Sequence, residues 1–441
     1  MKNEEKRDQM IRETFDQCLS GINLQPSVLP EIERKIEKTK TPERKRIPLR
    51  IPVIAAAAVV LVCVWFFAGN KKWELFSQPD RLSTDSRYTV QPMETVLSEG
   101  AERETAEETP GTEVKLNGIQ TIRKEDGTLQ CRMDGLVYTL RDDKTAVLSG
   151  VYFVSRKDPY ILDIPEKVGE YTVVALADDA LSSVNAFAAV HLPETLTTIG
   201  FYGFAYNPVL TEVTFPSSLR TIEWNAFMEC TSLASVTFEE GVETIQSGVF
   251  NGCKSLKSIV IPDSVTTLEG GAFSACTGLE EIVLPKGITE LGQEMFNSCS
   301  SLKQIEIPKG VTVVGNRAFK DCSALESVVL PEELVSLGNG AFNGCKSLKS
   351  VVIPEKVTAI ENGTFNGCTS LKTVVLPEGL TSIGSRAFYN CGSLSILSLP
   401  DGLASIGRDA FGGCDELLCV VSDGSAAMQY CEENGIKYTK R

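Results

Sequence analysis

Residues 345–365, CKSLKSVVIPEKVTAIENGTF, are one copy of a unit that recurs through the second half of this 441-residue chain. Leu348, Val351 and Ile353 have the spacing of a strand whose alternate side chains enter a core. Pro354 ends the strand because proline cannot donate to a ladder of hydrogen bonds. This short unit therefore indicates one strand and one turn of a larger, repeating fold.

The unit repeats with a fixed period of 23 residues and without insertions. Each cysteine of the series has a Phe three residues before it and a Leu three residues after it. The series comprises Cys230, Cys253, Cys276, Cys299, Cys322, Cys345, Cys368, Cys391 and Cys414. Self-similarity at such a period is typical of stacked supersecondary units, so the sequence predicts a solenoid.

The rest of each unit predicts how a coil returns to its start. Val357 and Ile360 are a second apolar pair, which we assign to a return leg. The dipeptide Ala341-Phe342 is expected to begin a short helical segment that ends at Cys345. Glycine often precedes this segment, where a positive φ is expected to require it. These glycines are Gly292, Gly315, Gly338, Gly384 and Gly407.

Proline recurs often enough to predict about eleven coils with one continuous parallel sheet over residues 165–421. The prolines follow Pro165 at 193, 216, 262, 285, 308, 331, 354, 377 and 400, with Glu239 in one slot. Departures fall at the ends, where Leu181 replaces Phe and Asn207 replaces Cys. The tail, residues 422–441, with a helix-like stretch at 426–434, is the expected C-terminal cap.

The pattern C-x-x-L-x-x-V-x-L-P-x-x-V-x-x-I-x-x-x-A-F-x-x-C resembles the BspA-like class of bacterial leucine-rich repeats. The resemblance covers about Gly135 to Tyr438 and includes the Gly-x-x-Tyr-x-Leu start at residues 135–140. It implies a right-handed leucine-rich repeat solenoid, mainly β with short helical turns, on a bacterial cell surface. The class is associated with adhesion and host-matrix binding, although a fold alone does not determine a ligand.

The segment before the repeats predicts a membrane anchor at residues 51–69. Ile51 to Ala68 spans 18 residues without a charge, ~27 Å as a helix and close to the ~30 Å hydrocarbon core of a bilayer. Aromatic residues follow at its far end, as in an interfacial belt. The alternative is a buried core helix. Residues 1–50 hold most of the flanking Lys and Arg, which places this head in the cytosol and the repeats outside.

Two further segments connect the anchor to the repeats. Residues 70–113 are rich in Ser, Thr, Glu and Pro, and predict a disordered acidic stalk. Residues 114–164 predict an N-terminal cap. In this cap, Gly135–Leu140 and Thr145–Gly150 are expected to form a β-hairpin around the polar turn Arg141–Lys144. Such a hairpin would cover the core that the first coil would otherwise expose.

The composition argues against catalysis and against nucleic acid as a ligand. The net charge is −15, whereas phosphate binding needs a basic face. His191 is the single histidine, and we expect it to be a solvent-facing residue of a strand. We identify no catalytic, cofactor-binding or metal-binding residues. The cysteine series is interpreted as buried structural thiols, because it lies between Phe and Leu core positions. Partial disulfides, including Cys419–Cys431, and metal or redox chemistry remain alternatives.

The outward positions of the strands form the candidate ligand face. They are Val260, Val283, Glu306, Val329, Val352 and Val375. A row of valines facing solvent on a rigid sheet is a candidate protein-binding surface. The alternative is that valine occurs there only because it fits a pleated strand.

Two functions follow from this organisation. The first is a non-enzymatic, membrane-anchored surface protein that uses the solenoid to bind an extracellular protein or other macromolecule. The second is a single-pass sensor in which residues 1–50 regulate a cytosolic partner. The layout of the second resembles anti-sigma regulators, although Cys18 is the head's only cysteine and the head has no histidine, so their zinc motif is absent.

Overall fold

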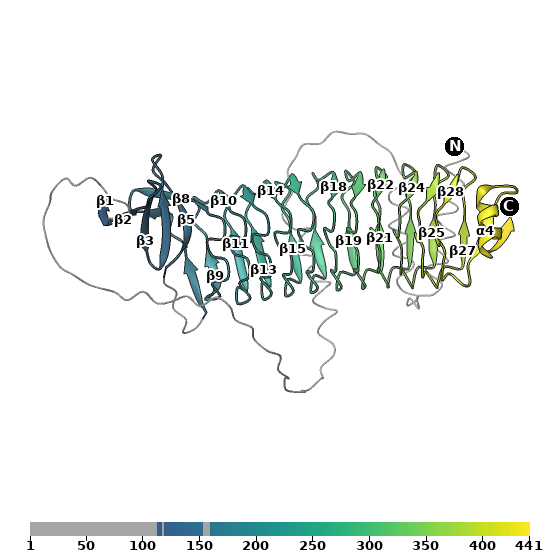
Figure 1. Cartoon of the computed structure of the whole chain (residues 1–441), viewed down its shortest axis with the longest axis horizontal. Coiled ribbons are helices and arrows are strands. Elements are labelled where there is room, and N and C mark those ends of the chain that lie inside the picture. The colour runs from purple at the N-terminus through teal and green to yellow at the C-terminus, as the bar shows by residue number, and fades with distance from the viewer. Residues whose placement is uncertain (1–112, 117–118, 153–158) are drawn as a thin grey trace, which may run out of the picture. The chain divides into compact units, whose positions relative to one another are not determined.

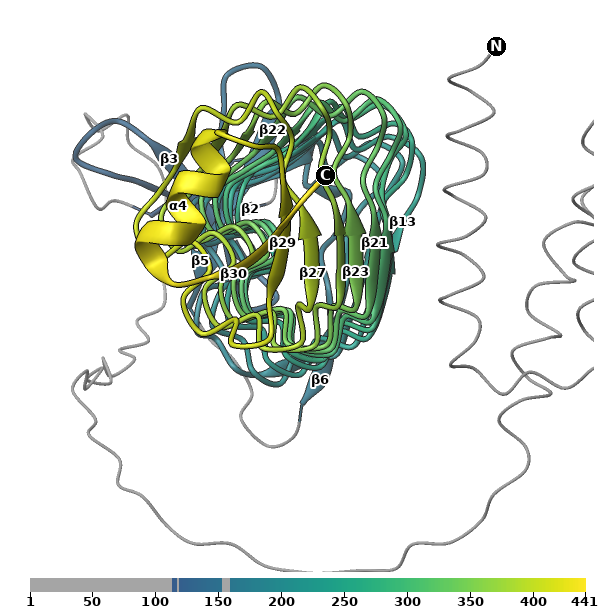
Figure 2. The same cartoon turned by 90° about the vertical axis from the view of Figure 1, so that its right-hand side faces the viewer.

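The computed structural model describes residues 113–116, 119–152 and 159–441, which belong to one compact unit, residues 101–441. Its coils stack side by side in Figure 1, and Figure 2 looks along the stack. No helix within these ranges is long and apolar enough to cross a membrane. The predicted head, the predicted span at 51–69 and residues 70–112 of the predicted stalk lie outside them.

An antiparallel meander precedes the coils. Its strands are β1 (Glu113–Leu116), β2 (Ile119–Arg123), β3 (Leu129–Met133), β4 (Leu136–Leu140) and β5 (Thr145–Val151). β4 and β5 form the hairpin predicted around residues 141–144. β5 then pairs in parallel with β8 (Tyr171–Leu176), which also pairs with the short β7 (Lys167–Val168). The antiparallel meander thus joins the parallel solenoid without leaving an open sheet edge at β5.

One side of the solenoid is a column of parallel strands, one from each coil. These strands are β6 (Tyr160–Asp163), β9 (Phe187–His191), β11 (Glu212–Phe215), β13 (Ser235–Phe238), β15 (Ser258–Val260), β17 (Glu281–Val283), β19 (Gln304–Glu306), β21 (Ser327–Val329), β23 (Ser350–Val352), β25 (Thr373–Val375), β27 (Ile396–Ser398), β29 (Leu418–Val421) and β30 (Lys437–Lys440). The column holds thirteen strands in the described residues, two more than the eleven coils predicted. Its ladder is interrupted between β13 and β15, β17 and β19, and β25 and β27, so the prediction of one continuous sheet is wrong. The proline count missed β29 and β30, because neither strand is followed by the repeat's proline.

The return legs form a second column of short parallel strands beside β8. They are β10 (Thr198–Ile199), β12 (Thr221–Ile222), β14 (Thr244–Ile245), β16 (Thr267–Leu268), β18 (Glu290–Leu291), β20 (Val313–Val314), β22 (Ser336–Leu337), β24 (Ala359–Ile360), β26 (Ser382–Ile383) and β28 (Ser405–Ile406). Equivalent residues pair from coil to coil, as Thr198 does with Thr221 and Ile199 with Ile222. The constant period of 23 residues therefore appears directly as strand register.

The segment from the return leg to each cysteine is a series of turns, so the prediction of short helical segments is wrong. Its backbone N–H groups alternate between a turn bond within the segment, such as Met228 N to Asn225 O at 2.9 Å, and a bond to the next coil. Phe227 N donates to Val249 O at 2.9 Å, and Phe319 N donates to Ala341 O at 2.7 Å. Left-handed residues, such as Asn225 (φ 56°) and Glu229 (φ 54°), interrupt any helix. The only helix of the described residues is α4 (Ala426–Asn434) at the C-terminal end.

The glycines that follow the return legs are required by close packing, and not by the positive φ that we predicted. None of the five has a positive φ. A Cβ added to Gly338 would lie 2.5 Å from Asn316 N of the preceding coil, and one added to Gly407 would lie 2.4 Å from Ser385 N. Real Cβ atoms do not approach backbone so closely, so glycine at these positions lets adjacent coils touch.

Stacked phenylalanines run through the core from Phe204 to Phe411. Successive rings are nearly parallel. The ring centroids of Phe319 and Phe342, for example, are 5.2 Å apart, and the angle between the ring planes is 5°. The stack ends in perpendicular contacts at both ends. Phe187 meets Phe204 at 85°, and Tyr430 of α4 meets Phe411 at 76°. Such edge-to-face contacts are favourable for aromatic pairs, so both ends of the stack are covered.

The cysteines form a second buried ladder beside the phenylalanines. Each thiol donates to the carbonyl of a Phe in the preceding coil, as Cys322 Sγ does to Phe296 O at 3.1 Å. Asn207 occupies the first slot of this ladder and is fully buried. Its Nδ2 donates to Leu181 O at 2.8 Å, while its Oδ1 accepts from Asn185 N at 2.8 Å. The end position thus uses a side chain that both donates and accepts, which a thiol does only weakly.

The C-terminal end is closed by α4 and the last two strands (Figure 2). Ser425 caps α4, with its Oγ accepting from Met428 N at 3.1 Å, and Gly435 follows in the left-handed conformation. Arg441 Nη2 reaches back to Leu399 O at 2.5 Å and to Asp401 at 2.6 Å. The tail therefore fastens the last coil through its helix and its final side chain.

Candidate functional site

The outward positions of the long strand column lie where the alternation of the sequence predicted. In β23, Val351 is buried, whereas Val352 is 61% exposed. In β21, Val328 is buried and Val329 is 77% exposed. Alternation along a strand sends neighbouring side chains to opposite faces. We call the six outward residues, Val260, Val283, Glu306, Val329, Val352 and Val375, the sheet face.

The sheet face is not uniform in exposure. Val260 and Val283 are 62% and 55% exposed, and Glu306 between the two pairs of valines is also exposed. Val375 is less exposed than these residues and has an intermediate exposed fraction. The strongest apolar exposure is therefore at Val329, in the middle of the stack.

Strand register places the members of the sheet face beside one another. Val260 pairs with Val283, Glu306 with Val329, and Val352 with Val375. Neighbouring parallel strands lie about 4.8 Å apart, so adjacent side chains on one face are in contact range. The arrangement can offer a narrow, rigid apolar row, interrupted by the single carboxylate of Glu306.

Alternating charges border this row. Lys303 pairs with Glu280 at 3.7 Å, and Lys349 pairs with Glu326 at 2.6 Å. The hydrogen bond and the charge of Lys349 lower the pKa of Glu326. Exposed pairs of this kind contribute little to stability, because water and salt screen them. They leave the border polar and nearly balanced in charge.

A shallow depression of about 390 Å³ lies on the sheet face between two strands. Val283 and Glu306 line it, together with Pro308, Lys286 and Lys309 from the loops that follow the strands. Lys286 is held by Asp263 at 2.6 Å. The depression therefore combines an apolar floor with charges of both signs at its margin, which suits a side chain of a macromolecule better than a deeply enclosed small molecule.

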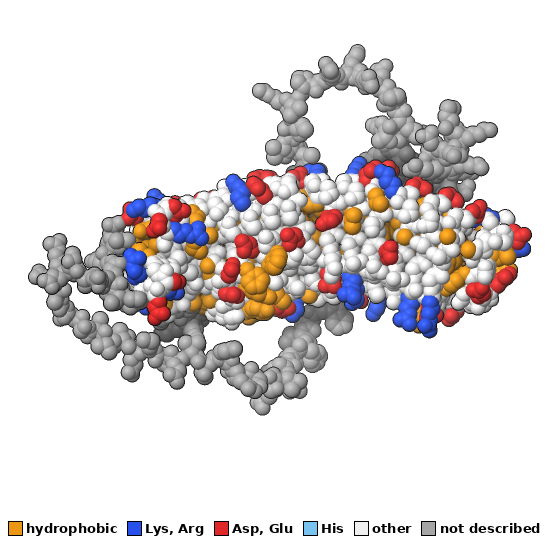
Figure 3. All heavy atoms as spheres, turned by 45° about the horizontal axis from the view of Figure 1, so that its top comes forward, with side chains coloured by type: hydrophobic (Ala, Val, Ile, Leu, Met, Phe, Trp, Pro, Cys, Tyr) orange, Lys and Arg blue, Asp and Glu red, His pale blue; other side chains and the backbone are white. Residues whose placement is uncertain are grey.

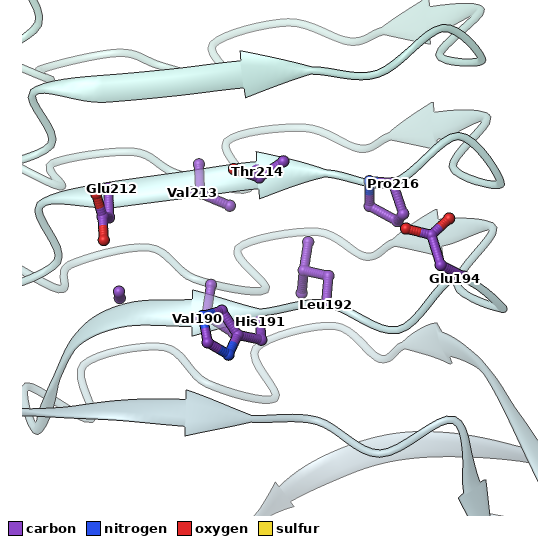
Figure 4. Close-up of a pocket in the computed structure, with 9 residues that line it drawn as sticks. Val190, His191, Leu192, Glu194, Glu212, Val213, Thr214 and Pro216 are labelled. Atoms are coloured by element: carbon purple, nitrogen blue, oxygen red, sulfur yellow. The ribbon is translucent and has the colours of Figure 1, made fainter.

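A second depression, of about 240 Å³, surrounds His191 on the same side of the solenoid (Figure 4). His191 Nδ1 lies 2.5 Å from Asp163 Oδ1, and both side chains are exposed. Glu212 and Glu194 lie at opposite ends of this depression in Figure 4. As predicted, His191 faces solvent from the outward side of β9.

An acid, an imidazole and a hydroxyl lie in one row here, but their geometry does not support nucleophilic catalysis. Asp163, His191 and Thr214 are register neighbours on β6, β9 and β11. Within the described residues, no hydrogen bond joins the Thr214 hydroxyl to the imidazole, which an activated nucleophile needs. The row is also open to water, and electrostatic stabilisation of a developing charge works best where water is excluded.

The buried cysteines are poor candidates for metal binding or redox chemistry. The twelve cysteines in the described residues are all buried and free. Burial raises the pKa of Cys230, of Cys276 and of Cys368 to about 12, so these thiols stay protonated at neutral pH. A reactive cysteine needs an accessible thiolate. No group of three or more metal-ligating side chains occurs in the described part of the chain.

Sequence reasoning missed one surface feature, an exposed group of aromatic residues on the turns of two neighbouring coils. Phe201, Tyr202, Tyr206 and Trp224 form this group, with Trp224 52% exposed. A signal was present in the sequence, because the equivalent slots in later coils hold mostly Gly, Ser, Asn or Gln. The repeat consensus does not include these residues, so a prediction made from the consensus does not identify them.

Solved structures similar to this chain include bacterial leucine-rich repeat proteins. A leucine-rich repeat protein of Bacteroides ovatus is 24% identical, with a TM-score of 0.49, over 70% of this chain and 99% of that chain. A leucine rich cell surface protein of Faecalibacterium prausnitzii is 25% identical (TM-score 0.45; 70% and 97% covered). The pneumococcal vaccine antigen PcpA is 18% identical (TM-score 0.49; 71% and 98% covered).

No curated protein matches the chain. The model of the BspA type leucine rich repeat region matches it in six copies, over residues 174–303 and 289–418. These residues span more than half of the sequence and coincide with the stacked coils. The chain therefore belongs to the BspA-type leucine-rich repeat family.

Proposed function

We propose that this chain is a non-enzymatic, membrane-anchored cell-surface protein whose solenoid binds an extracellular protein or other macromolecule through the sheet face. The observation that carries the proposal is the exposure of Val260, Val283, Val329 and Val352, at 55% to 77%, on a rigid parallel sheet. Exposed apolar rows of this kind mark binding surfaces more often than scattered single residues do.

The mechanism is the sum of many weak contacts along a preformed surface. The strands are fixed by inter-coil hydrogen bonds, so a partner would find the row already ordered. A preformed surface lowers the entropy that binding must overcome. The alternating Lys and Glu beside the row would select the partner's register by charge complementarity more than they would add affinity.

The test is adhesion of cells that display the full chain to an immobilised basement-membrane protein extract. We expect the Val329→Lys, Val352→Lys double variant to reduce adhesion at least tenfold, because it places two unpaired charges in an apolar contact. Val335→Lys is the matched control, since Val335 is an exposed valine (53%) outside the sheet face. Equal adhesion by the double variant and the parent chain would overturn the proposal for this surface.

The anchored and exported arrangement is part of the same proposal. It is supported by the uncharged stretch Ile51–Ala68 and by the basic residues that precede it. Treatment of intact cells with a protease that cannot enter them should degrade the repeats and spare an epitope placed on residues 1–50. Protection of the repeats in intact cells would contradict the proposed location.

A further inference from the structure

Four aromatic side chains gather on the turns of two adjacent coils, away from the outward positions of the long strands. We call Phe201, Tyr202, Tyr206 and Trp224 the aromatic patch. The rings of Phe201 and Tyr202 are 4.1 Å apart at their centroids, and those of Tyr202 and Tyr206 stack at 5.9 Å. Trp224 and Tyr206 are 52% and 41% exposed. The patch therefore presents aromatic surface to solvent instead of adding to the core.

The repeat itself does not require these aromatics. Phe201 and Trp224 occupy the same slot in successive coils, where later coils have small or polar residues. Those residues are Ser247, Gly270, Gln293, Asn316, Asn339, Asn362, Ser385 and Arg408. Since all of these coils stack in the same register, the slot tolerates a polar side chain. The aromatic residues at this place are thus additional to what the fold demands.

Two of the aromatics also occupy a backbone conformation that bulky residues rarely adopt. Tyr202 has a φ of 53° and Tyr206 a φ of 58°. The equivalent positions are also left-handed in the next coil, at Asn225 and Glu229, and in the coil after it, at Gly248 and Gly252. The left-handed backbone is therefore a property of these slots in the repeat, and Tyr202 and Tyr206 occupy it although glycine or asparagine would do so with less strain.

Hydrogen bonds between coils hold the patch in place. Tyr202 N donates to Trp224 O at 3.1 Å, and Tyr206 N donates to Met228 O at 2.7 Å. The Tyr206 hydroxyl also contacts Met228 Sδ at 3.7 Å. The aromatic side chains are therefore attached to a fixed framework, which reduces the entropy lost when a ligand contacts them.

Carboxylates lie in the coil before the patch and next to Trp224 within it. Asp178 and Asp179 precede it in the slots equivalent to Phe201 and Tyr202, and Glu223 directly precedes Trp224. Among the described residues, none of these three carboxylates pairs with a cation, whereas Glu229 pairs with Lys254 at 3.2 Å. In Figure 3, hydrophobic side chains likewise gather in the N-terminal half of the solenoid, with acidic side chains beside them.

Two carboxylates, Glu229 and Asp179, lie close enough to Tyr206 to influence its hydroxyl. Partial burial raises the pKa of Tyr206, and interactions with Tyr202 and with the charges of Glu229 and Asp179 raise it further. A cation above the rings would interact favourably with the same charges. It would also interact with the negative faces of the aromatic rings.

We propose that the aromatic patch binds a lysine- or arginine-rich peptide segment of a partner protein. The aromatic faces attract a cationic head and pack against its aliphatic stem, while Asp178, Asp179 and Glu223 supply the opposite charge. A neutral glycan would stack on the rings but would not use the charges of Asp179 and Glu223, whereas Asp178 already accepts from Phe201 N at 3.0 Å. This surface is separate from the sheet face, so the proposal stands or falls independently of the proposed function.

The test measures fluorescence polarisation of a fluorescein-labelled hexalysine peptide titrated with the full-length chain. The Trp224→Gln, Tyr206→Asn double variant should bind at least tenfold more weakly, because it removes two ring contacts. It introduces only residue types that other coils carry at these slots, Gln293 and Asn390. An unchanged unfolding midpoint will show that the variant folds, and Val335→Ser should bind like the parent chain.

Two probes distinguish the proposal from its alternatives. The same peptide with its lysines acetylated should lose at least tenfold in binding, because acetylation removes the charge and keeps the stem. Unchanged hexalysine binding by the double variant would overturn the proposal, because attraction to the chain's overall negative charge would then account for the signal. Binding of labelled cellohexaose that depends on Trp224, without binding of hexalysine, would also overturn it in favour of a glycan.

Discussion

The buried cysteine and phenylalanine positions and the exposed sheet face belong to the same coils. The residue type is constant at the buried positions and varies on the sheet face. Every coil from Cys230 to Cys414 has the same thiol and the same phenylalanine three residues earlier. The outward strand positions of those coils vary among Thr, Val, Glu and Ser. Each buried residue must match its copies above and below it, whereas an outward residue must match only solvent or a partner. Uniformity thus marks stacking, and variation marks the positions that are free for binding.

The largest expected contrast is between Phe319 and Val329 in neighbouring parts of one coil. Phe319 is fully buried between Phe296 and Phe342, at 5.4 and 5.2 Å. Phe319→Ala should lower the free energy of unfolding by about 3–5 kcal/mol, because it opens a cavity in the stack. Val329→Ala should change it by less than ~0.5 kcal/mol. Urea unfolding of both variants checks the prediction, and equal losses would contradict the contrast.

The second contrast concerns Asn207, which occupies the first slot of the thiol ladder, where the later coils have cysteine. Asn207→Ala removes the donor to the buried Leu181 O and the acceptor for Asn185 N, and so leaves both backbone groups without these partners. We expect a loss of about 2–3 kcal/mol. Asn207→Cys should recover part of it, since a thiol can still donate to Leu181 O. Urea unfolding measures both variants, and a Cys variant as unstable as the Ala variant would contradict the role of the donor.

A third contrast separates two glycines of similar appearance. Gly338→Ala would place a Cβ 2.5 Å from Asn316 N, whereas at Gly310 the nearest atom is 3.5 Å away. We expect Gly338→Ala to destabilise the chain by about 1–2 kcal/mol through overpacking. Gly310→Ala should be neutral or slightly stabilising, because alanine restricts the unfolded chain. Thermal unfolding of the two variants compares them, and a neutral Gly338→Ala would show that adjacent coils can separate.

The smallest effect is expected from the exposed charges beside the sheet face. Lys349 lowers the pKa of Glu326 in the folded chain, so the pair stabilises the fold above the unfolded pKa of Glu, about 4.3. This contribution is lost as the pH falls from there through the lowered pKa. Glu326→Gln should therefore lower the thermal unfolding midpoint slightly at pH 7 and leave it unchanged at pH 2. A larger change in the midpoint at pH 2 than at pH 7 would contradict the expected pH dependence.

Local patterns were sufficient to predict most of the coil. The period of 23 residues, the strand before each proline and the outward direction of Val329 and Val352 all follow from spacing along the chain. Val375 shows the limit, because its intermediate exposure depends on neighbours that spacing does not identify. The predicted span and head lie outside the described residues and stay predictions.

The features that sequence reasoning got wrong depend on contacts between coils. Ala341-Phe342 was expected to begin a helix, but Phe342 N donates to Thr364 O of the next coil at 2.8 Å, and only alternate N–H groups bond within the segment. We predicted that glycine is needed at position 338 for a positive φ. It is needed there because the backbone of the preceding coil leaves no room for a Cβ. β30 was missed because it pairs with β29 without carrying the repeat's signature. Non-local partners decided each case.

The thiol ladder has a consequence for how such a chain can evolve. Each inner coil offers its neighbours the same donors and acceptors, so recombination between two copies of the coding repeat adds or removes whole coils without creating a mismatch. Asn207 terminates the thiol ladder at one end, and Tyr430 terminates the phenylalanine stack at the other. Selection can therefore adjust the reach of the molecule in steps of one coil while its two ends stay unchanged.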